Sequence, residues 1–393
     1  MKKIFISKPS ILPLIFILLF FLLLTSCSSD EEAANLNGPT SNEQTIGILE
    51  AGESSNEAVH QAVDSLGRVI SLSGKPASII IAGKATLIAA DALALFTDYR
   101  SKILAMGLTN QGLGDFYAFL LPNLLITERL PHTVSAEEIA GLNPDLIIMK
   151  DRNYSSLGEK LHKLGYPVFS INLENTDDYL QEIQELGKLL NQENRADEIN
   201  LAYSSRLSYI RENLSSLKET QKENILLLYT TISDGITSFQ VPPASWIQTK
   251  LVKEAGAVPV WEKTAGSGNW QKVSFEQISK WNPDRIYIIS YKTPTTIYME
   301  EFKNSSLWQD LSAYQNNQIK SFPADFHNWA QPDTRWILGL QWLAKDLHPD
   351  IFEIIEIEEE LVSFYKDFYG ITDSSFFNTI LDRYRKSLLT IEK

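Results

Sequence analysis

Cysteine is almost absent from the chain, which has one, Cys27, in 393 residues. A single thiol excludes intramolecular disulfides and metal sites built from several cysteines. Histidine is also scarce, with five scattered residues, whereas zinc and manganese sites take tighter clusters of His, Asp and Glu. We therefore predict no free-metal site, although His132 and His327 remain open as axial ligands to haem or cobalt.

Net positive charge is lacking too. The net charge is −14 and the pI about 4.9, which argues against a nucleic-acid partner. The sequence has no Gly-x-Ser-x-Gly elbow, no His-Glu-x-x-His and no phosphate-binding glycine loop, and its carboxylates are not paired at a spacing typical of acid–base chemistry. These absences argue against an enzyme, and no cofactor is predicted.

The N-terminus has the layout of a secretory signal. Lys2 and Lys3 precede an apolar run over residues 11–24, which is too short for a stable membrane span and ends in Leu24-Thr25-Ser26-Cys27. This ending resembles a bacterial lipobox, whose cysteine is lipidated; the alternative is an ordinary signal peptide with a chance cysteine. We predict a signal over 1–27, a flexible linker over 28–60, and an extracytoplasmic protein anchored by lipid to the cell membrane, in the periplasm or on the outer face.

Short β-branched runs alternate with helical segments along the rest of the chain, which is typical of parallel sheets covered by helices. We predict two α/β lobes with central parallel sheets, joined by a long bracing helix and enclosing a ligand cleft. The predicted parts are an N-terminal lobe over 61–174, a helical connector over 175–217, a C-terminal lobe over 223–352 and a helical extension over 353–393.

One phrase occurs in both lobes, as VSAEEIAGLNPDLII over 134–148 and VSFEQISKWNPDRIYII over 273–289. In each copy a serine and the Glu or Gln three residues later form a capping box, and Asn-Pro-Asp ends the helix before a strand. Glu137 and Glu276 are not needed for the cap. Their simplest role is to complement the helix dipole, which contributes about 0.3–1 kcal/mol.

These motifs resemble those of substrate-binding proteins of ABC importers for iron–siderophores, haem and vitamin B12. The resemblance runs from about Asp64 to Phe352 and includes Asp64-x-x-Gly67-Arg68, both Asn-Pro-Asp modules and Leu338-Gly339-Leu340-x-Trp342-Leu343-Ala344-Lys345. The extension over 353–393 goes past the usual end of the family, and it is expected to pack on the second lobe or to meet a partner.

The resemblance implies a monomeric binding protein that delivers a ligand to the permease dimer of an ABC importer. An iron–siderophore comes first among the ligands, with haem, cobalamin or an oxyanion as alternatives. One glutamate on each lobe of such proteins meets permease arginines, and Glu137 and Glu276 match those positions. A lipid-anchored sensor or receptor without an importer is the alternative function, and an extracytoplasmic enzyme is a weaker one.

Ligands of open parallel sheets collect at the carboxyl ends of the strands. Aromatic walls suit a large flat or caged ligand, and cations suit its carboxylates or hydroxamates. The alternatives are local packing for each tryptophan and plain surface charge for Lys84 and Arg152, while Trp336 and Trp342 are expected in the core. The candidate cleft residues are Lys84, Asn110, Arg152, Tyr154, Trp246, Trp270, Lys292, His327 and Trp329.

Overall fold

The computed structural model describes residues 59–108, 111–122 and 128–392. Cys27, the predicted signal and nearly all of the predicted linker lie outside these residues, as does Asn110. None of the helices in the described ranges combines the length and the apolar character that crossing a membrane requires.

The first lobe contains a sheet of five parallel strands in the order β5-β4-β3-β6-β7. Its central strands are continuous apolar runs buried on both faces, as the sequence predicts. The strand order reverses between β3 and β6, which makes the carboxyl ends of these two strands the topological switch point. A hairpin, β1 (His60–Val63) and β2 (Val69–Leu72), precedes the sheet. The five strands are β3 (Ile79–Ala82), β4 (Ile103–Gly107), β5 (Glu128–Leu130), β6 (Leu146–Lys150) and β7 (Val168–Ile171).

The sheet of the second lobe is mixed rather than wholly parallel, and in this the prediction is corrected. Its parallel strands are as predicted, but Asp234 and Gly235 both have positive φ and turn the chain back along β8. A further antiparallel strand pairs beyond. The strands are β8 (Asn224–Ser233), β9 (Ile236–Val241), β10 (Val258–Pro259), β11 (Gln271–Val273), β12 (Arg285–Ile289) and β13 (Ile319–Ser321).

The helices of the first lobe are α1 (Thr86–Ala94), α2 (Phe116–Leu120), α3 (Ala136–Gly141) and α4 (Glu159–Lys163). The helices that follow the connector are α7 (Ile247–Glu254), α8 (Phe275–Trp281), α9 (Thr296–Lys303), α10 (Ser306–Gln309), α11 (Ser312–Gln315), α12 (Trp336–Leu347), α13 (Ile357–Tyr369) and α14 (Ser374–Ser387). As predicted, Ser135 and Glu138 form both arms of a capping box at α3, and Ser274 accepts from the Gln277 N–H at α8.

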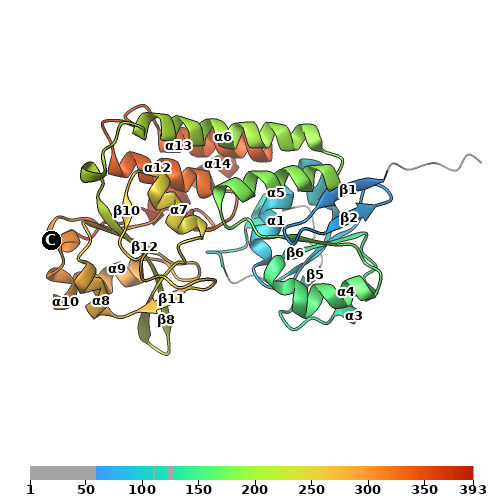
Figure 1. Cartoon of the computed structure of the whole chain (residues 1–393), viewed down its shortest axis with the longest axis horizontal. Coiled ribbons are helices and arrows are strands. Elements are labelled where there is room, and N and C mark those ends of the chain that lie inside the picture. The colour runs from blue at the N-terminus through green and yellow to red at the C-terminus, as the bar shows by residue number, and fades with distance from the viewer. Residues whose placement is uncertain (1–58, 109–110, 123–127, 393) are drawn as a thin grey trace, which may run out of the picture. The chain divides into compact units, whose positions relative to one another are not determined.

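Two helices form the connector between the sheets. Asn175 caps α5 (Thr176–Leu189), a left-handed residue at Asn191 ends it, and α6 (Glu193–Leu214) follows. At 1.5 Å per residue α6 is about 33 Å long. Its apolar stripe is buried, and it packs beside α5 and against α12 and α13 (Figure 1). The connector is therefore bound along its length rather than hinged.

The C-terminal extension covers parts of both lobes. On the second lobe, Tyr384 of α14 stacks on Trp329 with ring centroids 5.0 Å apart. On the first lobe, Arg100 donates to the carbonyl oxygen of Tyr369 at 2.8 Å. On the connector, Arg206 pairs with Glu360 of α13 at 3.1 Å. Since these contacts reach both lobes, α13 and α14 tie them together.

The buried apolar side chains form two clusters. The larger cluster is continuous through one face of the first sheet, the connector, the second lobe and the extension. The smaller cluster fills the opposite face of the first sheet, under α3 and α4, with Ile139 and Leu161 among its members. The two lobes thus share most of one hydrophobic core. Trp336 and Trp342 belong to it, as predicted.

Candidate functional site

A small cavity, about 30 Å³ in volume, lies between the two lobes. Arg152, which follows β6 at the switch point, lies on its first-lobe side, and Trp246 and Trp270 lie on its second-lobe side. A cavity needs about 10–15 Å³ to hold a single water molecule. Because this cavity is only a little larger, the cleft is nearly closed. Its lining consists of Ile88, Gln111, Arg152, Glu174, Trp246, Gln248, Trp270, Tyr291, Gln331 and Pro332.

The second-lobe wall of this cleft is aromatic. Trp246 meets Trp270 edge to face with centroids 5.7 Å apart, and Tyr229 lies between Trp270 at 4.6 Å and Tyr291 at 4.8 Å. Burial raises the pKa of Tyr291 well above its usual range, so its hydroxyl stays neutral. The wall therefore presents apolar ring surface with a neutral hydroxyl donor.

The polar atoms of the cleft include both signs of charge. The exposed Arg152 lines the cavity together with Glu174, whose carboxylate pairs with the buried Lys150 at 2.9 Å. Gln331 donates its amide N–H to the backbone oxygen of Gln111 at 2.8 Å, which fixes its orientation. Its Oε1 is buried and has no hydrogen-bond partner among the described residues. Such an acceptor costs about 1–3 kcal/mol until a ligand or water donates to it.

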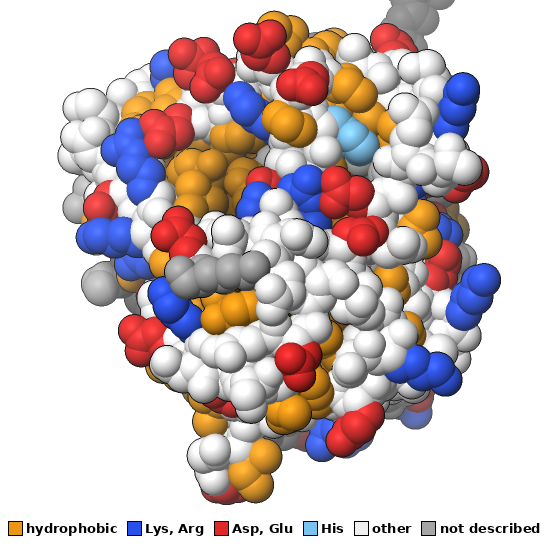
Figure 2. Space-filling model, turned by 90° about the vertical axis from the view of Figure 1, so that its left-hand side faces the viewer, with side chains coloured by type: hydrophobic (Ala, Val, Ile, Leu, Met, Phe, Trp, Pro, Cys, Tyr) orange, Lys and Arg blue, Asp and Glu red, His pale blue; other side chains and the backbone are white. Residues whose placement is uncertain are grey.

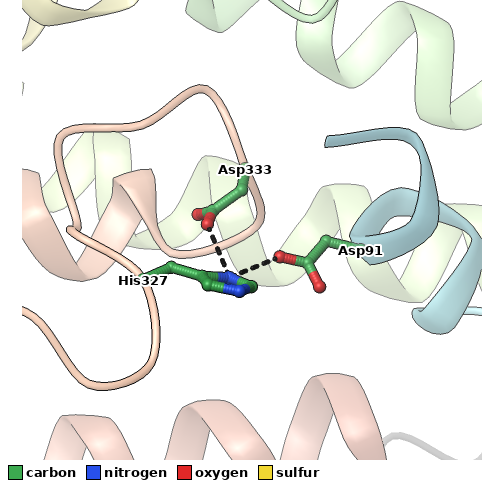
Figure 3. A group of neighbouring side chains, drawn as sticks. All are labelled: Asp91, His327 and Asp333. Carbon is green, nitrogen blue, oxygen red and sulfur yellow. Dashed lines mark hydrogen bonds and ion pairs between the residues drawn. The ribbon is translucent and has the colours of Figure 1, made fainter. Parts of the chain in front are cut away.

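A group of ionisable side chains lies at the junction of the lobes (Figure 3). Asp91 comes from α1 of the first lobe, whereas His327 and Asp333 come from the loop before α12 in the second. The Nδ1 atom of His327 lies 3.1 Å from an Asp91 oxygen and 3.2 Å from an Asp333 oxygen. All three side chains are almost wholly buried. The group therefore joins the two lobes. Its member Asp333 is two residues along the chain from Gln331, which lines the cavity.

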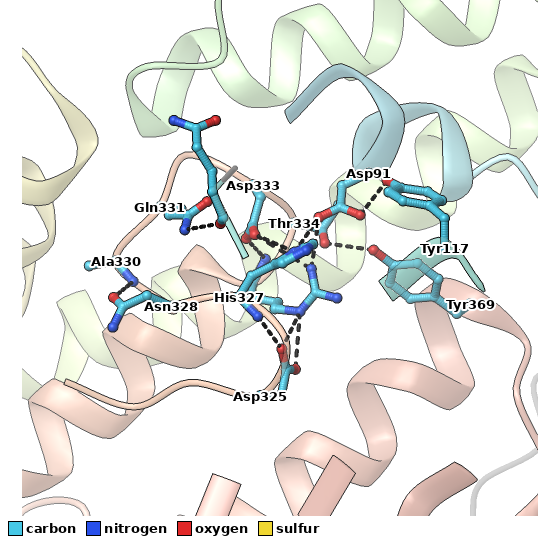
Figure 4. Close-up of polar contacts among 12 residues, drawn as sticks. Asp91, Tyr117, Asp325, His327, Asn328, Ala330, Gln331, Asp333, Thr334 and Tyr369 are labelled. Carbon is cyan, nitrogen blue, oxygen red and sulfur yellow. Dashed lines mark hydrogen bonds and ion pairs between the residues drawn. The ribbon is translucent and has the colours of Figure 1, made fainter. Parts of the chain in front are cut away.

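The same group contains the buried Arg335 and a third aspartate, Asp325, which Figure 4 labels. Arg335 places Nη1 2.8 Å from Asp91 and Nε 3.0 Å from Asp325. Tyr117 donates to Asp91 at 2.5 Å, and Tyr365 of α13 donates to Asp325 at 2.6 Å. First lobe, second lobe and extension therefore meet in one polar network, which we call the junction network.

The electrostatics of the junction network favour ion pairs. Burial alone would raise the pKa of Asp91, but Arg335 and His327 outweigh it and hold the pKa below its usual value. Burial and Arg335 would lower the pKa of His327, but the carboxylates of Asp91 and Asp333 raise it. Burial raises the pKa of Asp333. The two carboxylates therefore favour the protonated, charged form of His327.

The donor atoms of Asp91, His327 and Asp333 lie within 4.8 Å of one another, close enough to hold a metal ion. Carboxylates and an imidazole suit divalent transition metals. The guanidinium of Arg335, however, already lies against two of these carboxylates and would repel a cation there. The residues therefore fit an ion-pair network better than a metal centre, and we assign them a structural role.

The other predicted cleft residues that the structure describes do not line the cavity. Lys84 and Lys292 are exposed, and Tyr154 stacks under the guanidinium of Arg68, 3.6 Å from its ring centroid. His327 belongs to the junction network, and Trp329 is fully buried against Tyr384. Packing by α14 places Trp329 in the core, so it does not form an open cleft wall. Of the nine candidates, the cavity brings together Arg152, Trp246 and Trp270.

Glu137 and Glu276 are both exposed in the first turns of α3 and α8. Hydrogen bonding with the Ser274 hydroxyl lowers the pKa of Glu276, which keeps it charged at neutral pH. His132 is exposed, whereas His327 is buried.

Two α/β lobes with a cleft at the sheet switch point define a two-lobed binding protein. Residues 121–326 match the family model of periplasmic binding proteins. The chain belongs to this family, and membership places it outside the cytoplasm.

Two relatives in sequence carry specific names. The chain is 24% identical over 344 residues to the Fe(3+)-citrate-binding protein YfmC of Bacillus subtilis, covering 86% of this chain and 95% of that one. It is 24% identical over 282 residues to the molybdate-binding protein MolA of Haemophilus influenzae, covering 65% and 76%. Both are named as binding proteins rather than enzymes.

Solved structures support the same fold. The TroA-like periplasmic binding protein FepB of Veillonella parvula has a TM-score of 0.65 at 20% identity, covering 80% of this chain and 97% of that one. MolA bound to molybdate has a TM-score of 0.65 at 19% identity, covering 80% and 99%. At these identities the likeness concerns the fold alone.

Proposed function

We propose that the chain captures a ferric chelate in the cleft between its lobes and delivers it to the permease of an ABC importer. The observation that carries the proposal is the cavity itself, which both lobes line at the switch point. Arg152 suits the carboxylates or hydroxamates of such a chelate, and the rings of Trp246, Trp270 and Tyr291 suit its apolar parts.

A bare oxyanion is the second ligand to consider, because MolA is a relative and the cavity is small. A tetrahedral oxyanion would use Arg152 but has no apolar surface to bury against three aromatic rings. It also has no hydrogen to donate to the buried Oε1 of Gln331. These two features favour a chelate with O–H or N–H groups. A haem or corrinoid would require the widest opening of the cleft.

The anchor is part of the proposal. Lipid on Cys27 would hold the protein at the membrane, because two or three acyl chains anchor firmly where one binds only marginally. The segment between Cys27 and Val59 is long enough to let the lobes reach a neighbouring permease, at about 3.3 Å per extended residue.

Ligand binding should quench tryptophan fluorescence. We expect ferric citrate, titrated into the purified chain, to lower the emission, because Trp246 and Trp270 line the cavity. The double variant Trp246→Phe/Trp270→Phe should lose most of this response, and Arg152→Met should weaken binding about tenfold or more through the lost charged hydrogen bond.

The matched controls are Trp329→Phe and Lys84→Met. Trp329 is buried away from the cavity, and Lys84 is an exposed cation of the same lobe that does not line it. Both controls should titrate like the wild type. A full fluorescence response in the double tryptophan variant would place the ligand elsewhere.

Glu137 and Glu276 should dock the protein on basic sockets of the permease. We expect Glu137→Ala and Glu276→Ala each to reduce uptake of radiolabelled ferric citrate by cells, the double variant to reduce it further, and reversal to Lys to be worst. Charge pairs desolvated in an interface couple by about 1.5–7 kcal/mol. Ligand affinity should not change, since neither residue lines the cavity.

The control is Glu193→Lys, because Glu193 is also exposed in the first turn of a helix and loses the same dipole interaction. It should import like the wild type. Wild-type uptake by the double reversal, with normal folding and binding, would contradict the docking role of the two glutamates.

A further inference from the structure

The hairpin of β8 and β9 runs on past its sheet. β12 pairs with β8 as far as Tyr229, and β11 pairs with β9 as far as Phe239. Beyond these points, residues 230–238 form a two-stranded ribbon whose outer edges have no strand partner among the described residues. The ribbon projects past the rest of the lobe in Figure 1. We call residues 232–236 the hairpin tip.

Strand register places the hairpin tip near the first turn of α8. Val273, the last residue of β11, pairs with Phe239 of β9, and β11 runs antiparallel to β9. Ser274, which caps α8, is the next residue after Val273. In the same spatial direction, β9 extends three residues from Phe239 back to its first residue, Ile236. At about 3.4 Å per residue, the tip lies roughly 10 Å from the pair of Val273 and Phe239, on the side on which α8 starts. Glu276 and the tip therefore occupy neighbouring parts of one surface.

The hairpin tip is apolar and exposed. Ile236 is 71% exposed and Ile232 is 39% exposed. Ile297 of α9 is 49% exposed, one helical turn from Glu301, which accepts a hydrogen bond from Thr237 at 2.7 Å. Figure 2 has hydrophobic and acidic side chains together at its lowest projection. Single exposed apolar residues are ordinary, but three around a free ribbon call for a partner.

We infer that the hairpin tip is a second contact with the importer permease, an apolar peg inserted beside the charge pair of Glu276. The inference rests on the proposed docking function. It adds a difference between the lobes: Glu137 and Glu276 are equivalent, but the described part of the first sheet is wholly parallel and has no such hairpin. The peg would therefore select one of two opposite orientations on a symmetric permease dimer.

The surroundings of the tip favour this partner over two others. Asp234 lies in the tip, and Glu301 and Glu276 lie near it, all exposed. These acids oppose an anionic lipid surface, and with a net charge of −14 they oppose a second copy of this chain. A permease face with basic sockets around an apolar groove complements both the charge and the exposed isoleucines.

The test is photo-cross-linking in the source cell with the full chain. A photoreactive phenylalanine analogue replaces Ile236, Glu276 or, as control, Ile354, which is 77% exposed just before α13. Cross-linked partners are identified by mass spectrometry. In parallel, Ile232→Ser/Ile236→Ser and the control Ile354→Ser are compared for uptake of radiolabelled ferric citrate and for ligand affinity.

The expected result is one integral-membrane permease captured from both position 236 and position 276 but not from 354. The serine pair should reduce uptake about tenfold at unchanged ligand affinity, and Ile354→Ser should not, since one buried isoleucine side chain accounts for a tenfold effect. Capture of the permease from position 276 alone would overturn the peg and leave docking intact. Capture of lipid or of a second copy of the chain from position 236 would do the same. Capture of a permease from neither position would overturn docking and the peg together.

Discussion

Replacing Arg335 by methionine is expected to lower the free energy of unfolding by about 3–5 kcal/mol at neutral pH, the usual cost of breaking a buried ion pair by removing one partner. The substitution leaves Asp91, Asp325 and Asp333 buried with His327 as the one remaining charge partner in the junction network. Urea unfolding measures the change. The matched control is Arg211→Met, because Arg211 is 45% exposed and pairs with Glu254 at the surface, where such a pair contributes about 0–1 kcal/mol.

The pH dependence should change sign in the same variant. In the wild type the pKa values of Asp91 and Asp325 are depressed, so their stabilisation is present above the unfolded pKa and is lost as pH falls through the folded values. Without Arg335, burial raises these pKa values, and the variant should gain stability on acidification from neutral pH. Parallel pH profiles for the two proteins would contradict the ion-pair assignment of the network.

Ending the chain at Ile355 should abolish cooperative folding. The deletion removes α13 and α14, whose buried rings include Phe364, Tyr365, Tyr369 and Tyr384, and each buried aromatic side chain contributes about 1.5–3 kcal/mol. Four such losses sum to about 6–12 kcal/mol, which is comparable to the roughly 5–15 kcal/mol that holds an ordinary protein folded. Circular dichroism and urea unfolding of the shortened chain measure the effect.

Two milder variants keep this second prediction testable. Tyr384→Ala should cost about 3–5 kcal/mol, because it uncovers the fully buried ring of Trp329. Removal of Glu392 and Lys393 alone should have no measurable effect, since Glu392 is exposed. A wild-type unfolding midpoint for the chain ending at Ile355 would show that the extension is an appendage rather than part of the core.

The parallel strands and the two capped helices could be predicted because their causes are local. Ile79-Ile80-Ile81 is a strand on its own evidence, and Ser135 and Glu138 satisfy each other within one helical turn. The hairpin was missed although Asp234-Gly235 between two runs of β formers is a hairpin signal. The parallel strands elsewhere in the chain led to the prediction of a wholly parallel sheet, in which this signal had no place.

The cleft could be predicted only in part, because a strand end fixes where a loop begins and not which side of the sheet it faces. Arg152 lies two residues beyond β6 and lines the cavity, whereas Trp329 lies eight residues beyond β13 and is covered by α14. That cover comes from Tyr384, 55 residues further along the chain. No residue near Trp329 in the sequence indicates that Tyr384 covers it.

The junction network was missed for a similar reason. Asp91 is the one charge in the apolar helix Thr86–Ala94, all of which is buried, and a lone acid in such a helix must find a partner. The sequence raises that requirement but does not name the partner, because Arg335 is 244 residues away. The identity of a buried ion pair depends on the folded topology.

The division of the core into two clusters makes the two helices proposed for docking mechanically unlike, although both follow a Val-Ser pair and share a Glu and an Ile at matching positions. Ile278 of α8 belongs to the continuous core that reaches the connector, the extension and the floor of the cleft, whereas Ile139 of α3 belongs to the separate cluster on the far face of the first sheet. Force applied by a permease at Glu276 would thus be transmitted through stiff, close-packed side chains toward the ligand, while force at Glu137 would be absorbed locally. The second lobe would act as the lever and the first as the fixed support.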